Sequence, residues 1–278
     1  MRLLGVGDNV VDRYRDLGRM FPGGNALNVA VAARRAGIEA AYIGALGTDR
    51  AGETVLGALR AEGLELDRLR VVDGPNAWAE VTLVEGDRVF VGSHVGVSRF
   101  RLDETDLAYA ASFDLIHTGD CSMVEDQVAD LAARAPVSFD FSIHREPGYT
   151  EALLPHLEIA CFSASDLDEE AALDLLAAAV ARGPRLALAT RGTAPALLFD
   201  GRRTWRQAAV PVQVVDTLGA GDSFIGCLLA GLVTGQDPAV ALEAAADAAA
   251  RTCADYGAFG HGVPIALETA AEAAPAAS

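Results

Sequence analysis

Short β-prone runs alternate with longer Ala- and Leu-rich runs along most of the chain. This alternation is typical of a parallel sheet flanked by helices, and it predicts an α/β fold in three layers, an α/β/α sandwich with a mainly parallel central sheet. We predict strands over Arg2–Gly7, Ala40–Gly44, Leu115–His117, Val137–Phe141, Ile159–Phe162 and Leu186–Thr190. We predict helices over Asn25–Ala36, Gly52–Glu62, Val124–Arg134, Asp166–Arg182, Ala220–Thr234 and Pro238–Asp255.

Two strand-like runs break this alternation. Trp78–Leu83 and Arg88–Gly92 flank Glu85-Gly86-Asp87, which is a hairpin turn signal. The segment Asp12–Asp16 is a candidate to pair with this hairpin. Because such a ribbon does not belong to a βαβ repeat, we predict a small β-lid formed by about residues 12–16 and 76–97.

A second hairpin is predicted where Ala196–Phe199 and Arg203–Arg206 flank Asp200-Gly201. The chain shows neither an internal repeat nor a linker long enough to divide it, so we expect residues 1–278 to form a single domain. The Ala-, Pro- and Ser-rich tail after Glu272 is expected to be frayed.

Composition excludes several classes of protein. The formal net charge of −17 argues against a nucleic-acid partner, because phosphate backbones are held by clustered Lys and Arg. All 22 basic residues are Arg. Without lysine there is no Schiff base to pyridoxal phosphate, no Walker A loop and no protein-kinase strand lysine. Any nucleotide phosphate must then be held by backbone amides, helix dipoles, Arg or metal.

The location is predicted from the cysteines and from the start of the chain. The four cysteines lie far apart without metal-ligand or redox spacing. Met1 leads directly into a β-prone run, and no stretch of 18 apolar residues occurs. We therefore expect a cytoplasmic protein that does not associate with a membrane.

The strongest local signal is the run Asp216–Phe224. A β-rich run, Val210–Val215, ends at this point and a long helix begins near Ala220. Gly219 and Gly221 allow backbone amides to converge at the positive end of that helix, which forms an anion hole suited to a phosphoryl group in transfer. Asp222 falls in the first helical turn, where its carboxylate can take a proton from a hydroxyl presented there. A capped helix start is the alternative.

Two motifs together resemble one family. The sequence Asp-Thr-Leu-Gly-Ala-Gly-Asp at Asp216–Asp222 is similar to the C-terminal signature of the ribokinase-like (PfkB) carbohydrate kinases, and Gly23–Ala30 is similar to their N-terminal pattern. The resemblance covers essentially the whole chain. It implies a ribokinase-like fold, a β-lid over a sugar, ATP and Mg²⁺ as cofactors, and catalysis by Asp222 with the amides of Gly219, Ala220 and Gly221.

The N-terminal motif predicts where the sugar binds. Gly23 and Gly24 bring backbone close to a ligand, and Asn25 and Asn28 offer amides at a helix start. Asp8, just past the first strand, adds a carboxylate that can accept two hydroxyls. A helix cap with a turn is the alternative to sugar binding. Three further residues are candidates for the substrate-binding set. Phe90 comes from the resemblance, and Asp12 and Glu80 are acidic groups that would suit a substrate carrying a secondary ammonium.

The nucleotide side is assigned from the resemblance. Thr190, Arg191 and Gly192 match a family stretch that lies close to the nucleotide, although Pro195 replaces its final glycine. The other residues expected on this side are Thr217, Gly219, Gly221 and Thr252. In the family, an Asn-x-x-Glu motif helps to organise Mg²⁺, and Ser163–Asp166 stands in its place here. Asp166 or Glu169 is the candidate to replace the glutamate and contact Mg²⁺ through water. A solvated helix start explains these acidic residues equally well.

Family members often bind a monovalent cation near the anion hole. The resemblance places such a site, for K⁺, at the carbonyls around Asp216, Leu218 and Gly257. An exposed lid edge also makes a homodimer through the lid plausible, because sheet edges are commonly covered by a partner.

Several local runs are similar to fructoselysine kinases within this family. They are Gly7–Asp12, Gly23–Val31, Asp87–Phe90, Phe139–Ser142 and the serine at Ser163. The resemblance implies phosphorylation of the 6-hydroxyl of fructoselysine or another fructosamine. Two alternatives stay open: a kinase for another small sugar or a nucleoside, with fructose, ribose and 2-keto-3-deoxygluconate as candidates, or a non-catalytic sugar-binding regulator on the same scaffold.

Overall fold

The main sheet has eight strands in the order β14-β13-β12-β11-β10-β9-β1-β4. The computed structural model describes residues 1–84 and 87–265, and for residues 83, 84 and 87–90 it describes the backbone alone. The strands from β12 to β4 run parallel and the last two are antiparallel. The strands are β1 (Arg2–Val6), β4 (Glu39–Ile43), β9 (Leu115–Gly119), β10 (Val137–Asp140), β11 (Ile159–Ser163), β12 (Leu186–Thr190), β13 (Ala196–Phe199) and β14 (Thr204–Gln207).

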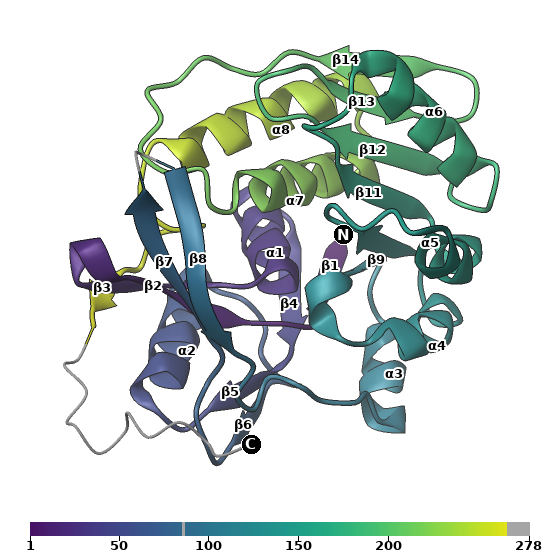
Figure 1. Ribbon diagram of the computed structural model, residues 1–278. Coiled ribbons are helices and arrows are strands. Elements are labelled where there is room, and N and C mark those ends of the chain that lie inside the picture. The colour runs from purple at the N-terminus through teal and green to yellow at the C-terminus, as the bar shows by residue number, and fades with distance from the viewer. Residues whose placement is uncertain (85–86, 266–278) are drawn as a thin grey trace.

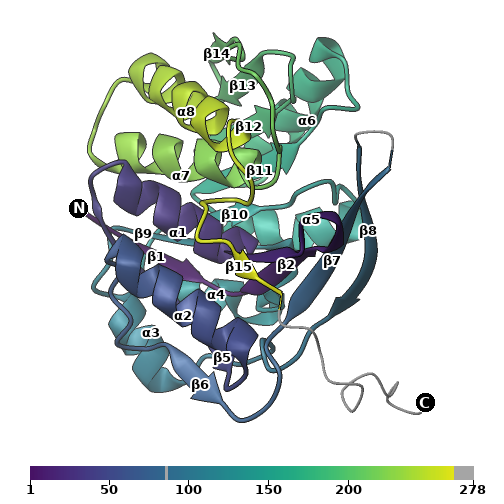
Figure 2. The ribbon, with the colours of Figure 1, turned by 90° about the vertical axis from the view of Figure 1, so that its left-hand side faces the viewer.

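Helices cover both faces of this sheet and enclose two hydrophobic cores (Figures 1 and 2). Successive side chains of a strand point to opposite faces, so Leu3 belongs to one core and Leu4 to the other. The first core is covered by α1 (Asn25–Arg35), α2 (Arg50–Glu62), α7 (Ala220–Val233) and α8 (Pro238–Cys253). The second is covered by α3 (Glu104–Ala110), α4 (Val128–Ala132), α5 (Pro147–Leu153) and α6 (Glu169–Val180). The predicted three-layer α/β/α sandwich is confirmed.

Side-chain caps move several helix starts away from the predicted residues. Asp49 caps α2 by accepting from Gly52 at 2.9 Å, so the helix begins at Arg50. Asp168 accepts from the Ala171 amide at 2.8 Å, so α6 begins at Glu169 rather than at Asp166. The helix predicted over Val124–Arg134 is a 3₁₀ turn followed by the short α4. The 3₁₀ segments are Arg15–Leu17, Asp120–Ser122, Glu125–Gln127 and Leu154–His156.

A second sheet of five strands stands off the main sheet, in the order β15-β3-β2-β7-β8. β2 pairs in parallel with β7, and Asp12 lies opposite Ala79. β7 and β8 form the hairpin, whose turn at Glu85-Gly86 lies outside the described residues, as does the tail after Glu272. The strands are β2 (Val10–Tyr14), β3 (Arg19–Gly23), β7 (Trp78–Val84), β8 (Asp87–His94) and β15 (Val263–Pro264), and a separate pair is formed by β5 (Ala45–Gly47) and β6 (Arg70–Val72).

The β-rich run Val210–Val215 does not form a strand. It is an extended loop in which Val212, Val214 and Val215 are exposed. The end of the run is fixed by the amides of Val215 and Asp216, which donate to the Cys253 carbonyl at the end of α8. The loop therefore reaches α7 without joining the sheet.

Candidate active site

The turn before α7 is shaped by one glycine and one carboxylate. Gly219 has a φ of 71°, and a Cβ at this position would lie 2.4 Å from the Cβ of Ala258. Glycine alone fits this conformation and this approach. The buried carboxylate of Asp216 accepts from the backbone amides of Leu218 and Gly257, both at 3.0 Å. It also accepts from the hydroxyl of Tyr14, on β2 of the lid. Asp216 thus holds the turn against the loop that follows α8.

Backbone amides of this turn are open. In the part of the chain that the structure describes, no carbonyl or side chain accepts from the amides of Gly219, Gly221 or Asp222. The Ala220 amide donates to the Thr217 carbonyl at 3.3 Å, in a long turn bond. Open amides at the positive end of a helix are suited to hold a phosphoryl group. The chemical role of these amides stays a prediction.

Asp222 is held by two amides from a neighbouring helix. Its two carboxylate oxygens accept from Asn25 Nδ2 at 2.8 Å and from Asn28 Nδ2 at 2.7 Å, both on α1. Burial raises the pKa of Asp222 to about 7, the two amides lower it, and the nearby charge of Asp140 raises it. The carboxylate is therefore turned into the protein beside the open amides, with a pKa suited to a base at neutral pH.

A second carboxylate, which the sequence analysis did not assign, lies next to Asp222. Asn25 Nδ2 also donates to Asp140 Oδ2 at 2.8 Å, so a single amide bridges the two acids. The Ser142 amide donates to the other oxygen of Asp140, and burial raises the pKa of Asp140 to about 6. Its position at the carboxyl end of a parallel strand is the sequence signal that could have indicated it.

Asp8 lies at the N-terminus of α1. Its carboxylate accepts from the backbone amides of Asn25 at 2.9 Å and Ala26 at 3.2 Å, and from the Ser122 hydroxyl at 3.3 Å. Burial raises the pKa of Asp8. A Cβ at Gly24 would lie 2.7 Å from the backbone of Asn9, so this glycine allows the close approach. Asp8 therefore acts as a helix cap, and its contact with a sugar stays a prediction.

The lid contributes residues above this helix start. Asp12 is buried on β2, and a Cβ at Gly23 would lie 2.5 Å from its carboxylate. Glu80 lies on β7 and forms an ion pair with Arg15 of the lid. The side chain of Phe90 lies outside the described residues. The structure thus brings Asp12, with Gly23, to the N-terminus of α1, and it places Glu80 on the same small sheet.

The predicted nucleotide residues are not all presented to a ligand. Thr190 and Gly192 lie at the end of β12, and Gly192 has a φ of 61°. The Arg191 guanidinium is buried and donates to the carbonyls of Leu167 at 3.1 Å and Pro195 at 3.4 Å. It therefore holds the loop together, and its contact with a nucleotide stays a prediction.

Two further nucleotide residues lie around α7. The carbonyl of Thr217 is in the turn, where it accepts from Ala220. The hydroxyl of Thr252, on α8, is 2.7 Å from the hydroxyl of Ser223 on α7. Thr252 therefore faces the contact between these two helices.

The candidate Mg²⁺ ligands are engaged by arginines. Asp166 accepts from both terminal nitrogens of Arg145, at 2.7 and 2.8 Å, and this pairing lowers its pKa to about 2. Glu169 accepts from Arg206 at 2.7 Å. Among the described residues, no cluster of three or more His, Cys, Asp or Glu side chains has the arrangement of a metal site. Mg²⁺ commonly keeps several water ligands and is bound through one or two carboxylates together with substrate phosphates.

Comparison with known proteins decides the family. The model of the pfkB family carbohydrate kinases matches residues 10–264. The chain belongs to this family. The pfkB kinase described here is 45% identical over 273 residues to the fructosamine kinase FrlD of Bacillus subtilis, with 96% of each chain covered. It is 38% identical over 256 residues to the fructoselysine 6-kinase of Escherichia coli, covering 91% of this chain and 98% of the relative.

A solved structure shows the same fold. A putative ribokinase II from E. coli, in complex with ATP and Mg²⁺, superimposes with a TM-score of 0.77 at 21% identity, covering 93% of this chain and 94% of the other. The resemblance to ribokinase-like kinases is thus confirmed, and the protein is an ATP-dependent carbohydrate kinase. Within residues 1–84 and 87–265, no helix has the length and apolar character needed to cross a bilayer.

Proposed function

We propose that this kinase transfers the γ-phosphoryl group of ATP to the 6-hydroxyl of fructoselysine or another fructosamine. The names of its two relatives, at 45% and 38% identity over more than nine-tenths of this chain, support this class of acceptor. A fructosamine carries a secondary ammonium. The acidic side chains around the helix start, Asp8 and Asp12, suit a cation better than they suit an anion.

Asp222 is the proposed general base. Its half-buried carboxylate lies beside the open amides of the turn, and this juxtaposition is the observation that carries the proposal. Asp222 takes the proton of the attacking hydroxyl while the amides of Gly219 and Gly221 stabilise the charge on the transferring group. Asn25 and Asn28 fix the orientation of the carboxylate, since each donates to one of its oxygens.

Mg²⁺ neutralises charge on the triphosphate when it is bound. The engagement of Asp166 by Arg145 fits an ion that enters with ATP and keeps its water ligands, rather than a preformed protein cage. Within this proposal Asp166 and Glu169 contact the ion through water. The acidic group must then separate from its arginine, which the exposure of both Asp166 and Glu169 permits.

A monovalent cation, K⁺ in the proposal, lies near the turn. Support comes from the carboxylate of Asp216, which accepts hydrogen bonds from the backbone amides of Leu218 and Gly257. These bonds bring the turn before α7 and the loop after α8 together. Assays with K⁺ replaced by a large organic cation test this site: turnover is expected to fall, and unchanged turnover would remove it.

Dimerisation through the lid and a cytoplasmic location complete the proposal. β8 forms one edge of the five-stranded sheet, and its Val91 is 53% exposed. All four cysteines are free thiols, which suits a reducing compartment. Sedimentation of the purified protein distinguishes monomer from dimer.

Replacement of Asp222 tests the catalytic proposal. Asp222→Asn keeps the size of the side chain but removes the base, so kcat is expected to fall about 10²- to 10⁴-fold. Binding of the sugar, measured by calorimetry, should change little. The control is Asp247→Asn, which neutralises an exposed acid on α8 and should leave kcat unchanged. Near-normal turnover of Asp222→Asn would remove this residue from its role.

A panel of acceptors with ATP tests the substrate class. The panel contains fructoselysine, fructose, ribose and 2-keto-3-deoxygluconate. We expect the highest kcat/KM for fructoselysine. A higher value for a free sugar would assign the kinase to that sugar, and sugar binding without any turnover would indicate a regulator.

A further inference from the structure

The hydroxyl of Tyr14 connects the five-stranded sheet to the turn before α7. Tyr14 is the last residue of β2 and is 2% exposed. Its hydroxyl donates to Oδ2 of Asp216, and Figure 1 shows the small sheet beside the end of α7 at which the helix begins. A buried hydrogen bond to a carboxylate is one of the stronger polar contacts in a protein, so this bond fixes where the sheet meets the turn.

The carboxylate of Asp216 passes this contact on to two backbone segments. Its Oδ1 accepts from the Leu218 amide inside the turn, and its Oδ2 accepts from the Gly257 amide in the loop after α8. The same Oδ2 accepts from Tyr14, so strand, turn and loop meet at a single carboxylate. The shape of the turn, and with it the direction of its open amides, therefore depends on how this carboxylate is held.

A small hydrophobic cluster joins the same parts of the molecule. Its members come from three strands of the small sheet, from the turn and from the loop after α8, and they include Tyr14, Phe21, Val81, Leu218 and Tyr256. The ring of Tyr14 lies edge-on to Phe21, with 5.3 Å between the ring centroids, and to Tyr256, with 6.2 Å. These contacts are made by the ring and not by the hydroxyl. Removal of the hydroxyl alone therefore leaves the cluster in place.

Phe21 brings the loop after α8 close to the small sheet. A Cβ at Gly257 would lie 2.7 Å from the ring of Phe21, and a Cβ at Gly262 would lie 2.2 Å from it. Gly257 is also the residue whose amide donates to Asp216. The small sheet thus reaches Asp216 directly through the hydroxyl of Tyr14 and indirectly through the packing of Phe21 on this loop.

We propose that Tyr14 is a positioning residue for phosphoryl transfer, and that it couples the lid over the sugar to the turn that holds the phosphoryl group. This inference rests on the proposed function, in which Asp12 lies at the sugar. Asp12 and Tyr14 are two residues apart on β2, so their side chains lie on the same face of the sheet. A sugar that fixes Asp12 also fixes Tyr14, whose hydroxyl then holds Asp216 and the turn in place for ATP. Tyr14 acts through Asp216 and not by contact with the reacting atoms.

This coupling has a thermodynamic consequence. Because the sugar orders the lid and the lid orders the turn, the sugar and ATP strengthen each other's binding by the same factor. Coupling between two sites is typically about 5- to 150-fold in affinity. Without the hydroxyl of Tyr14 the turn keeps its amides but loses one link to the small sheet, so the coupling factor becomes smaller.

Calorimetry measures the coupling factor directly. Fructoselysine is titrated into the enzyme with and without a non-hydrolysable ATP analogue and Mg²⁺, at one fixed K⁺ concentration. We expect the analogue to tighten fructoselysine binding at least about fivefold in the wild type and less than about twofold in Tyr14→Phe. Binding of fructoselysine without the analogue should be the same in both. The kcat of Tyr14→Phe should fall about tenfold, because the turn is held less firmly during transfer.

Tyr109→Phe is the matched control. The hydroxyl of Tyr109 also donates to a carboxylate, Oε1 of Glu65 at 2.6 Å, but Tyr109 is on α3, which supplies no residue to the candidate site. This variant loses a hydrogen bond of the same kind and should keep the wild-type kcat and coupling factor. A loss of stability alone would affect both variants alike, so a change confined to Tyr14→Phe reports the coupling. Thermal unfolding shows whether both variants are folded under the conditions of the titration.

Two results would overturn the proposal. One is a wild-type enzyme in which the ATP analogue leaves the affinity for fructoselysine unchanged. The other is a coupling factor in Tyr14→Phe equal to that of the wild type, whatever the kcat of the variant. The proposed function fails separately, when the wild type does not phosphorylate fructoselysine; the sugar with the highest kcat/KM in the acceptor panel then takes its place in the same titrations.

Discussion

At the scale of single residues, opposing effects set the proton affinity of Asp222. Burial disfavours the charged carboxylate and raises its pKa, whereas two amide donors favour the charged form and lower it. The charge of Asp140, bridged through Asn25, opposes ionisation further. The resulting pKa of about 7 leaves the base partly ionised at neutral pH and strong enough to take a hydroxyl proton.

The pH dependence of turnover follows from this pKa. Because the base acts only when it is ionised, kcat/KM should rise with pH through an acidic limb near pH 7. The effect of the raised pKa on the stability of the fold runs the other way with pH. The folded protein holds this proton more tightly than the unfolded chain does, so protonation of Asp222 stabilises the fold below the unfolded pKa of about 4. That contribution to stability is lost as the pH rises toward 7. Initial rates between pH 5 and 9 measure the limb, and a kcat/KM that stays constant down to pH 5 would contradict the assignment.

Removing the charge of Asp140 should move that limb. In Asp140→Asn the like charge beside Asp222 disappears, so the acidic limb is expected to shift to lower pH, by on the order of one unit. The limb belongs to the coupled pair of acids rather than to either residue alone. Asp126→Asn, which neutralises an exposed acid, is the control and should leave the limb in place. A shift to higher pH would contradict the electrostatic account.

Sequence predicts the local part of the site but not its long-range part. Gly219, Gly221 and Asp222 are adjacent, so turn chemistry and helix polarity suffice to place them together. The bridge from Asn25 to Asp140 and Asp222 joins three distant segments and depends on the order of strands in the sheet. For Arg191 the local sequence is not enough. Its guanidinium donates to backbone carbonyls around its own loop, and the local sequence does not encode this side-chain direction.

At the scale of elements, the site depends on how closely α1 and α7 approach. A Cβ at Gly226 would lie 2.5 Å from the Val29 carbonyl oxygen and 2.6 Å from the Cβ of Ala32. The absence of a side chain at Gly226 thus allows the two helices to touch. The amides that orient the base are on α1 and the base itself is on α7, so the spacing of the helices sets the geometry of the site.

Gly226→Ala tests this dependence. The added methyl must push α1 away from α7, and a displacement on the order of 1 Å at a reacting group can cost about 10²-fold in rate. We expect kcat to fall at least tenfold and stability to fall by about 1–3 kcal/mol. Gly57→Ala on α2 is the matched control, because its Cβ would meet nothing within 4 Å. This control should keep kcat and gain up to about 1 kcal/mol. Equal kcat in the two variants would contradict the argument.

The elements that sequence patterns predict well are those with regular periodicity. β1 and α1 lie within a few residues of their predicted bounds. β3 has no comparable signal, because Pro22 and Gly23 are unusual in strands and its place is set by pairing with β2. The run Val210–Val215 has the composition of a strand, but its end is held by the amides of Val215 and Asp216, which donate to the Cys253 carbonyl, so a tertiary contact outweighs composition here.

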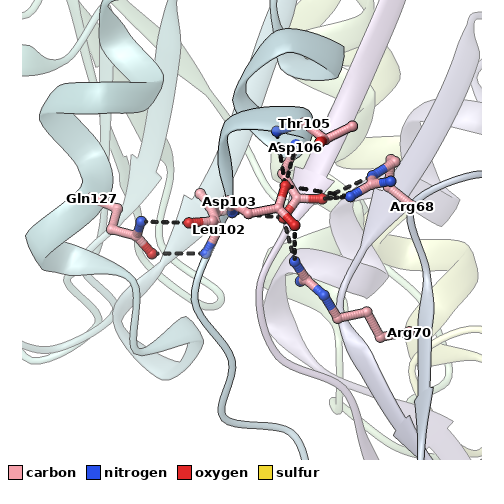
Figure 3. Close-up of polar contacts among 7 residues, drawn as sticks. All are labelled: Arg68, Arg70, Leu102, Asp103, Thr105, Asp106 and Gln127. Atoms are coloured by element: carbon pink, nitrogen blue, oxygen red, sulfur yellow. Dashed lines mark hydrogen bonds and ion pairs between the residues drawn. The ribbon is translucent and has the colours of Figure 1, made fainter.

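At the scale of the whole molecule, one polar network ties the two helical layers together at the β4 end of the sheet. Asp106, in the first turn of α3, is fully buried and accepts from Arg68, on the chain between α2 and β6, and from Arg70, the first residue of β6 (Figure 3). It also accepts from the backbone amide of Asp103 at 2.9 Å. Because α2 and α3 cover opposite faces of the sheet, this carboxylate joins the two layers. Beside it, the side-chain amide of Gln127 pairs with the backbone of Leu102.

Asp106→Ala should therefore weaken the fold without changing the chemistry. Removing one member of a buried ion pair leaves the other charge without compensation and costs about 3–5 kcal/mol, and the partial exposure of Arg68 and Arg70 favours the lower value. The midpoint of thermal unfolding should fall by about 6 °C, at about 2 °C per kcal/mol for a chain of this size.

Asp126→Ala breaks the ion pair with Arg101, in which both side chains are more than half exposed, and should cost less than about 1 kcal/mol. Urea unfolding of both variants, with kcat measured below the transition, separates stability from catalysis. The network lies on α3, which supplies no residue to the candidate site, so the folded fraction of Asp106→Ala should turn over at the wild-type rate. Equal losses in the two variants would show that burial of Asp106 does not strengthen its pairing, and that the two layers are held by their hydrophobic cores alone.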